Sequence, residues 1–314
     1  MKKVFIDGSA GTTGLRIFDR LHGRTDIQLL TLPESERKLE SSRKRLLNEA
    51  DVVFLCLPDD AAREAASWVE NPDTVVLDTS TAHRTAPGWC YGFPELSPVQ
   101  EARLRQAKRI AVPGCHASGF IALVYPLISA GLLAPDVLLS CYSLTGYSGG
   151  GKKMIAEYES PDRPAHSKLD APKSYGLGLA HKHLPEMQKI SGLAHTPMFV
   201  PVVCDYYCGM QVLVPLDLTL AGTTAEQVAA GIAGYYKDAA TVKVHGLNET
   251  LPENGLYSNA MAGTDRMELY LTVNAAGDQM MLVSVFDNLG KGSSGAAVQC
   301  MNLMLGLEET EGLE

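Results

Sequence analysis

Short apolar runs alternate with amphipathic segments over the first 114 residues. The runs are four to seven residues long, and the segments between them place apolar side chains at helical spacing. Continuous apolar strands separated by helices are typical of a parallel sheet that is covered on both faces. The pattern predicts strands at 4–7, 27–32, 51–57, 74–78 and 109–112, and helices at 13–21, 41–50 and 60–69.

The pattern changes after residue 115. A helix is predicted at 116–127, and longer strands then follow one another at 137–143, 198–203, 211–219, 241–245, 267–274 and 279–286. Only two clear helices, 185–191 and 224–236, interrupt them. Strands that succeed one another directly indicate a mixed or antiparallel sheet, and therefore a second domain of α+β type.

The last helix, predicted at 294–305, carries an apolar stripe of Ala297, Met301 and Met304. We expect it to pack back on the first domain. The fold class is therefore α/β, with a Rossmann-type parallel-sheet domain and an α+β domain. We place the first domain at 1–114 plus 290–314 and the second at 115–289.

Composition narrows the classes of partner. The chain has 314 residues, 46% of them apolar, and a net charge of −9 from 27 basic and 36 acidic side chains. Nucleic acid and anionic lipid are not expected partners of such a surface. Apolar runs fall short of the roughly 18 residues that span a bilayer, and the N-terminus does not resemble a signal peptide. We expect a cytoplasmic protein.

The seven cysteines do not suggest disulfides, because their number is odd and the chain is long. Cys204 and Cys208 are four residues apart, but no further ligands follow at a spacing that suits zinc. No metal is therefore expected.

A glycine-rich loop follows the first predicted strand and opens the first helix. Glycines let a backbone approach a pyrophosphate, and a helix start offers free N–H groups. The spacing is GxxGxxG, so the position in a βαβ run carries much of the signal. The coenzyme-binding candidates here are Gly8, Ser9, Gly11, Thr12, Thr13 and Gly14.

The end of the second predicted strand favours NADP(H) over NAD(H). NAD-binding units place an acidic residue there, whereas Arg meets the 2′-phosphate of NADP. Ser35, Arg37 and Lys38 offer a hydroxyl and two cations, although a solvated turn would look the same.

Cys115 lies between a strand end and a helix start, in the sequence VPGCHASGF. A helix N-terminus lowers the pKa of a thiol, and its N–H groups can hold an oxyanion. Most cysteines are simply small buried side chains, but Pro-Gly before Cys115 and the helix after it favour a nucleophile.

Two histidines and a carboxylate precede the next helix. His181 and His183 alternate in HKHLPE, with Glu186 three residues on. Either imidazole could serve as the base for Cys115 while the other binds substrate, and Glu186 could orient a ring. The sequence leaves open which is the base.

Two further glycine-rich loops contain polar side chains. Residues 143–153 offer hydroxyls, N–H groups and cations that suit a carboxylate or phosphate. The loop at 287–299 includes Asn288, whose amide can pair with a carboxamide. A linker and a helix-capping turn are the simpler alternatives.

Taken together and in order, these segments resemble the N-acetyl-γ-glutamyl-phosphate reductases of arginine biosynthesis, in their shorter form. The resemblance spans nearly the whole chain and includes GSAGTTG, LDTSTAHR, YGFPEL, PGCHASG, SGGGKK, HKHLPE and DNLGKGSSGAAVQ. It implies the semialdehyde-dehydrogenase fold, in which a Rossmann domain is followed by a domain for catalysis and dimer contacts, and the last helix returns to the first. It departs from the longer form at the second strand and at His116.

The resemblance implies NADPH-dependent reduction of an acyl phosphate through a cysteine thioester. It assigns Cys115 as the nucleophile, His181 and His183 as the histidine pair, Asn288 as the nicotinamide partner and Arg84 as a residue near the substrate phosphate. We also expect Pro58 to contact the coenzyme. Besides Arg84, the expected substrate site includes Ser118, Ser143, Gly146 and Lys152. A homo-oligomer, dimer or tetramer, is expected.

Two other functions remain open. An enzyme like aspartate-semialdehyde dehydrogenase would use the same chemistry on a shorter, unacetylated substrate. A non-catalytic NADP-binding sensor would keep the glycine loop but would not need Cys115 with His181 and His183.

Overall fold

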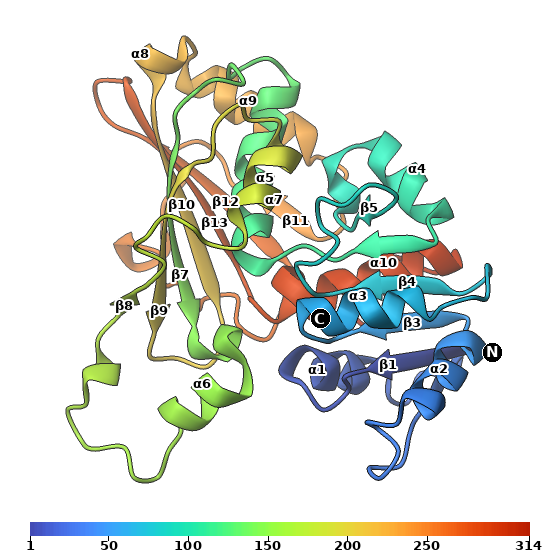
Figure 1. Cartoon of the computed structure of the whole chain (residues 1–314). Helices are drawn as coiled ribbons and strands as arrows, with labels where there is room; N and C mark the ends of the chain where they lie inside the picture. The colour runs from blue at the N-terminus through green and yellow to red at the C-terminus, as the bar shows by residue number, and fades with distance from the viewer. The chain divides into compact units, whose positions relative to one another are not determined.

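The computed structural model describes residues 1–314, with the exception of the side chain of Glu253. The chain folds into two compact units, the first made of residues 1–114 and 293–314 and the second of residues 115–292. The second crossing between units thus lies at 292/293, whereas the sequence placed it at 289/290. Figure 1 shows the element order along the chain.

A six-stranded parallel sheet forms the centre of the first unit. Its strands, ordered β2-β1-β3-β4-β6-β5, are β1 (Lys2–Asp7), β2 (Ile27–Leu30), β3 (Val52–Leu55), β4 (Val75–Asp78), β5 (Cys90–Tyr91) and β6 (Arg109–Ala111). The order reverses between β1 and β3, which is where ligands bind in open parallel sheets. The predicted Rossmann-type sheet is confirmed.

Helices cover both faces of this sheet. They are α1 (Thr12–Leu21), α2 (Glu40–Glu49), α3 (Asp59–Ser67), α4 (Pro98–Gln106) and α10 (Gly295–Leu305). One apolar core joins α1, α4 and α10 to alternate strand residues such as Val4 and Phe54, and a second joins α2 and α3 to their neighbours Phe5 and Val53. The last helix therefore packs on the first domain, as predicted.

Helix α4 was missed by the periodicity argument because its hydrophobic pattern is weak. The sequence nevertheless contains signals for the start of this helix. Ser97 accepts a hydrogen bond from the backbone N–H of Gln100 at 3.0 Å, and Pro98 occupies the first helical position. Both are standard signals of a helix N-terminus.

A seven-stranded mixed sheet forms the second unit. Its strands, ordered β11-β12-β13-β10-β7-β9-β8, are β7 (Ser140–Gly146), β8 (Lys173–Ser174), β9 (Met198–Cys204), β10 (Met210–Asp217), β11 (Val242–Val244), β12 (Met267–Val273) and β13 (Gln279–Phe286). The pairs β7–β9 and β11–β12 are parallel and the other pairs antiparallel. The predicted α+β unit is confirmed.

The second unit has more helix than the sequence indicated. Its helices are α5 (Cys115–Ser129), α6 (Gly151–Tyr158), α7 (Leu184–Ser191), α8 (Leu218–Ala221) and α9 (Ala225–Tyr235). The expectation of only two helices between the strands was wrong. The predicted strand 211–219 ends at Asp217, because its carboxylate accepts the N–H of Leu220 at 2.9 Å and starts α8. The predicted loop 143–153 likewise ends in α6.

Helices α5, α7 and α9 pack together on one face of the second sheet (Figure 1). Gly119 of α5 lies against Val212 and Ser284 of the sheet, so closely that a Cβ at this position would come within 2.6 Å of their side chains. Only glycine allows α5 to approach the strands this closely.

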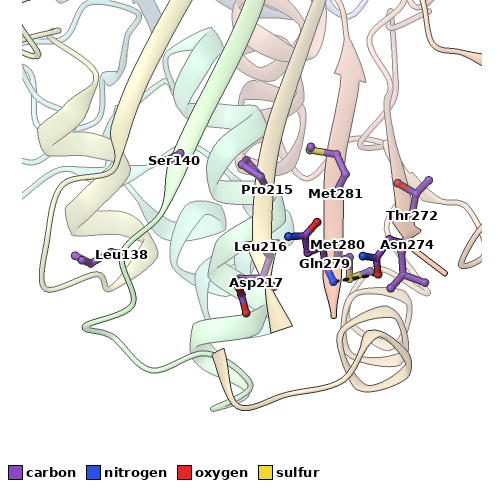
Figure 2. Close-up of a pocket in the computed structure, with 11 residues that line it drawn as sticks. Leu138, Ser140, Pro215, Leu216, Asp217, Thr272, Asn274, Gln279, Met280 and Met281 are labelled. Carbon is purple, nitrogen blue, oxygen red and sulfur yellow. Dashed lines mark hydrogen bonds between the residues drawn. The ribbon is translucent and has the colours of Figure 1, made fainter. Parts of the chain in front are cut away.

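The opposite face of the second sheet is much less covered. Along β7, Cys141 and Ser143 are fully buried toward the helices, whereas Tyr142 is 48% exposed; Met198 of β9 is 59% exposed. A hollow of about 650 Å³ lies at one end of the sheet, where Figure 2 shows Ser140, Pro215, Thr272 and Met281 from four strands around it. None of the candidate catalytic residues lines this hollow.

In the described part of the chain, no helix is both long and apolar enough to cross a membrane.

Candidate active site

The glycine loop of the first unit has the geometry that the sequence predicted for it. Gly8 follows β1 with a φ of 89°, and a Cβ there would lie 2.3 Å from the carbonyl oxygen of Cys56. A Cβ on Gly14 would lie 2.5 Å from the carbonyl oxygen of Gly8. Side chains are excluded at both positions, so the loop exposes backbone at the carboxyl edge of the sheet.

The start of α1 has polar groups that a phosphate would satisfy. Its N-cap is Gly11, which supplies no side-chain hydrogen bond to the first N–H groups. The hydroxyl oxygen of Thr12 is buried and has no hydrogen-bond partner among the described residues. An anion at a helix N-terminus would satisfy both. The residues present therefore fit the pyrophosphate of a dinucleotide.

The remaining coenzyme candidates of the first unit lie at the same edge of the sheet. Ser35, Arg37 and Lys38 are exposed in the turn between β2 and α2, and Pro58 is the exposed N-cap of α3 just after β3. Ser9 and Thr13 are half-buried in the glycine loop, and the hydroxyl of Thr13 lies 3.3 Å from that of Ser293. Carboxyl ends of parallel strands meet at one edge, so this placement suits one dinucleotide.

Arg84 is a structural anchor in the first unit. Its side chain is buried, and its Nε and Nη2 donate to the carbonyl oxygens of Val112 and Thr79, both at 2.9 Å. Val112 stands three residues before Cys115, so Arg84 fixes the segment that leads to the nucleophile. Its contact with the substrate phosphate stays a prediction.

Cys115 is the first residue of α5 and is half-buried. Gly292 approaches it closely, since a Cβ on Gly292 would lie 3.0 Å from that of Cys115. The thiol therefore sits at the N-terminal end of a 15-residue helix, where a thiolate is favoured.

Three histidine rings contact one another in the second unit, and one of them belongs to His116, the residue after Cys115. The ring of His116 lies 5.6 Å from that of His181 and 5.5 Å from that of His183, and the last two are 4.8 Å apart. Phe199 of β9 packs against His116 and His181 at 5.2 and 5.1 Å. The structure thus brings the HKH segment against His116 in the first turn of α5, whereas the roles of nucleophile and base stay predictions.

Burial keeps two of these rings neutral. Burial, with a smaller contribution from the charge of nearby Lys182, lowers the pKa of His116 to about 3 and that of His181 to about 4. The Nδ1 of His181 accepts the backbone N–H of His183 at 3.2 Å, so the proton of the neutral ring resides on Nε2.

His116, the residue after Cys115, and its hydrogen-bond partner Tyr175 are polar residues that sequence reasoning did not assign to the site. His116 Nδ1 lies 2.7 Å from the hydroxyl of Ser143, and its Nε2 lies 2.8 Å from the hydroxyl of Tyr175. Burial and then the charge of Cys115 raise the pKa of Tyr175. Tyr175 belongs to a long glycine-rich loop, and only its position six residues before His181 pointed to the site.

The other site candidates of the second unit are placed less uniformly. Glu186 and Ser118 are buried in the first turns of α7 and α5, and Lys152 is exposed on α6. Ser143 is fully buried on β7, and Gly146 is buried at the end of that strand, so both belong to the packed layer beneath the site.

Asn288 is occupied by the protein itself. Its amide nitrogen donates to the hydroxyl of Ser148 at 3.0 Å, and its oxygen accepts the N–H of Gly209 at 2.9 Å. Both contacts lie within the second unit. A nicotinamide would have to use the remaining hydrogen-bonding capacity of this amide.

Sequence comparisons place both halves of the chain in one family. Residues 3–104 match the NAD binding domain of semialdehyde dehydrogenase, and residues 115–288 match its dimerisation domain.

Curated relatives are similar over nearly their whole length. The N-acetyl-gamma-glutamyl-phosphate reductase 2 of Pseudomonas putida is 46% identical, with 98% of each chain covered. The reductase of Burkholderia cenocepacia is 48% identical over 96% of this chain and 97% of its own. That of Trichormus variabilis is 45% identical, with 99% of each covered.

Solved structures share the fold at much lower identity. Aspartate semialdehyde dehydrogenase II of Vibrio cholerae superposes with a TM-score of 0.71 at 16% identity, covering 98% of both chains. The Candida albicans enzyme with NADP gives 0.67 at 16% identity, covering 97% of this chain and 98% of that one. Full-length similarity to the curated reductases decides the family: the chain belongs to the N-acetyl-γ-glutamyl-phosphate reductases, within the semialdehyde dehydrogenases.

Proposed function

We propose that this chain catalyses the NADPH-dependent reduction of N-acetylglutamyl 5-phosphate to N-acetylglutamate 5-semialdehyde and phosphate, a step of arginine biosynthesis. The family supplies the reaction. The observation that carries the mechanism is that Cys115 begins α5 and that His181 and His183 contact the ring of His116, the next residue of that helix.

Cys115 acts first as the nucleophile. Its thiolate attacks the acyl carbon, a carbon–sulfur bond forms, the carbon–oxygen bond to phosphate breaks, and inorganic phosphate leaves. The N-terminus of α5 favours the thiolate, and backbone N–H groups at a helix start suit the oxyanion that develops during attack. The product of this step is a thioester on Cys115.

Bound NADPH supplies the hydride that reduces this thioester. Hydride addition gives an alkoxide, which takes a proton from a neighbouring histidine to form the thiohemiacetal. Its hydroxyl returns that proton to the histidine as the carbon–sulfur bond breaks, which releases the semialdehyde and regenerates the Cys115 thiolate. A base and a hydrogen-bond donor are therefore needed next to the sulfur.

We assign the tasks of base and hydrogen-bond donor to His183 and His181. His181 carries its proton on Nε2, because its Nδ1 is occupied by the backbone of His183. A neutral ring in this tautomer donates to the substrate and does not accept a proton from it. We therefore assign His183 as the base and His181 as the donor, with Glu186 as the residue that orients an imidazole.

NADPH is the coenzyme that the first unit suits. The open glycine loop and the hydroxyl of Thr12 suit the pyrophosphate, and Ser35, Arg37 and Lys38 lie at the sheet edge where the 2′-phosphate is expected. The carboxylate of Glu36, in the same turn, accepts a hydrogen bond from the hydroxyl of Ser42 at 2.8 Å.

Lys152 and Arg84 are the cations that we assign to the anionic groups of the substrate. Lys152 is exposed at the start of α6 and free to meet a carboxylate. Ser118 and Gly146 are assigned to the substrate site as well.

We also propose a homo-oligomer built on the less covered face of the second sheet. The matched domain is named for dimerisation, and the exposed apolar side chains of Tyr142 and Met198 lie on this face, which also has the hollow of Figure 2. A second copy would bury them. Tyr142→Asp should shift the mass measured by light scattering toward the monomer; an unchanged mass would exclude this face.

The cytoplasm is the compartment that we propose. All seven cysteines are free thiols, as in proteins kept in a reducing compartment.

A panel of aldehydes in the reverse direction tests the proposed function. With phosphate and NADP⁺, N-acetylglutamate semialdehyde should be oxidised far faster than aspartate semialdehyde, because the acetyl group and extra methylene contribute contacts worth several kcal/mol. Equal rates would favour an enzyme like aspartate-semialdehyde dehydrogenase. NADP⁺ binding with neither aldehyde oxidised would favour the sensor.

A further inference from the structure

A buried ion pair lies at the start of the glycine loop. Asp7 is the last residue of β1, directly before Gly8, and is only 4% exposed. Arg43, in the first turn of α2, donates through Nε to both carboxylate oxygens of Asp7 at 3.1 and 3.2 Å, and through Nη2 to Oδ2 at 2.8 Å. The guanidinium also lies over the ring of Trp68, 4.8 Å from its centre. Both side chains of the pair are therefore held in one arrangement.

The carboxylate of Asp7 is in an unfavourable place for an anionic coenzyme. It stands beside Gly8, whose backbone a pyrophosphate would approach. Without its partner, a charge at this range would change the affinity for a nearby anion by about tenfold. Arg43 cancels this charge, whereas Lys44, the next residue, is paired with Glu40 at 2.5 Å.

Stability is a weak reason for an ion pair at this position. Buried ion pairs are often no more stabilising than apolar side chains of similar size. The face of β1 that Asp7 shares with Phe5 is otherwise apolar, and Phe5 packs there with Val53 and with α2. The pair instead connects two parts of the expected coenzyme site, because Asp7 precedes the glycine loop and α2 follows the turn at 35–38.

We propose that Arg43 is a positioning residue for the coenzyme that acts through Asp7: it cancels the negative charge at the start of the glycine loop and ties that loop to α2. This role rests on the proposed binding of the pyrophosphate by the glycine loop. Because the effect is one of charge, the two partners have opposite consequences. Loss of the cation leaves an anion that repels NADPH and NADH alike, whereas loss of the anion leaves a cation that attracts them.

The test is the affinity of the full chain for NADPH and for NADH, measured without substrate by titrating the fluorescence of the reduced nicotinamide. Arg43→Met should weaken the binding of both coenzymes by about tenfold, because both carry the pyrophosphate. Asp7→Asn should bind both at least as tightly as the wild type, and the double variant should return to the wild-type affinity. Arg43→Lys keeps the charge and loses the forked contact, so it should retain most of the affinity.

Arg24 and Asp26 form a matched control pair in the same sheet. Arg24 donates through Nε and Nη2 to the two carboxylate oxygens of Asp26 at 3.0 and 2.6 Å, and its side chain is likewise buried. Asp26 directly precedes β2 at the amino edge, where Lys2 is the register partner of Ile27. Asp7 lies at the other end of β1, about 16 Å along the strand and well beyond the screening length of about 8 Å. Arg24→Met and Asp26→Asn should therefore leave both affinities unchanged.

Two of these variants decide the outcome even if Arg43→Met fails to fold. That variant leaves a buried charge without a partner, which is strongly destabilising, whereas Asp7→Asn and the double variant do not. Weaker binding by Asp7→Asn would reduce the pair to a structural tie and overturn the proposal, as would unchanged affinity in Arg43→Met. Wild-type affinity in Gly14→Ala would refute the glycine loop as the pyrophosphate site, and the proposal with it.

Discussion

The neutral, buried His116 should make the protein lose stability as the pH falls. Burial lowers the pKa of His116 to about 3, whereas the pKa of an unfolded histidine is about 6.5. Between these values the unfolded chain binds a proton that the folded chain excludes. Stability from this group is therefore complete above about pH 6.5 and declines as the pH falls toward 3.

The size of the effect follows from the two pKa values. Between pH 7 and pH 5, linkage to a group with this shift costs about 2 kcal/mol of unfolding free energy. His181, whose pKa is lowered to about 4, acts in the same direction. His116→Phe removes the titrating ring. Between pH 7 and pH 5, the unfolding free energy of this variant should therefore fall by about 2 kcal/mol less than that of the wild type, whatever the stability of the variant at pH 7.

Urea unfolding at pH 7 and pH 5, followed by far-ultraviolet circular dichroism, measures this difference. Trp68 and Trp89, the two tryptophans of the chain, both lie in the first unit, so their fluorescence reports that unit separately. Tyr175→Phe is the control, because it removes the hydrogen bond with Nε2 of His116 but keeps the histidine, and it should retain the wild-type pH dependence. If His116→Phe shows the wild-type pH dependence too, His116 is not the buried neutral ring described here.

Three further predictions concern the coenzyme and the base. Arg37→Ala should reduce the preference for NADPH over NADH in kcat/KM, and an unchanged ratio would remove Arg37 from the 2′-phosphate site. Gly14→Ala should weaken NADPH binding at least tenfold in a fluorescence titration, because its Cβ would lie 2.5 Å from the carbonyl oxygen of Gly8; equal affinity would show that the loop does not hold the pyrophosphate. His183→Asn should lower kcat by about a hundredfold or more, the range of general base catalysis, and His181→Asn by less; the reverse order would exchange their roles.

The sequence predicted the architecture well because hydrophobic periodicity determines which faces are buried. Val4 and Phe5, like Cys141 and Tyr142, are consecutive residues that face opposite sides of a sheet. The segments shared with the reductase family indicated the reaction. Predictions failed where local signals competed with the pattern. Asp217 ends an otherwise apolar strand by capping a helix.

The site was only partly predictable, because hydrogen bonds between distant residues leave no pattern in the sequence. Cys115 and the histidine pair stand out by residue type and spacing. His116 and Ser143 are 27 residues apart, and Tyr175 is 59 residues from His116, so their connection appears only once β7 and β9 are paired. Arg84 looked like a phosphate ligand, but two of its hydrogen bonds are with backbone carbonyls.

The thioester on Cys115 is the central claim, and trapping it is the most direct test. The protein is mixed with N-acetylglutamyl 5-phosphate without NADPH, quenched in acid within one turnover, and digested for peptide mass spectrometry while released phosphate is counted. The account predicts an N-acetylglutamyl adduct on Cys115, about one phosphate per active site, and neither product in Cys115→Ser. No adduct and no phosphate burst with wild-type protein, or an adduct on another cysteine, would contradict it.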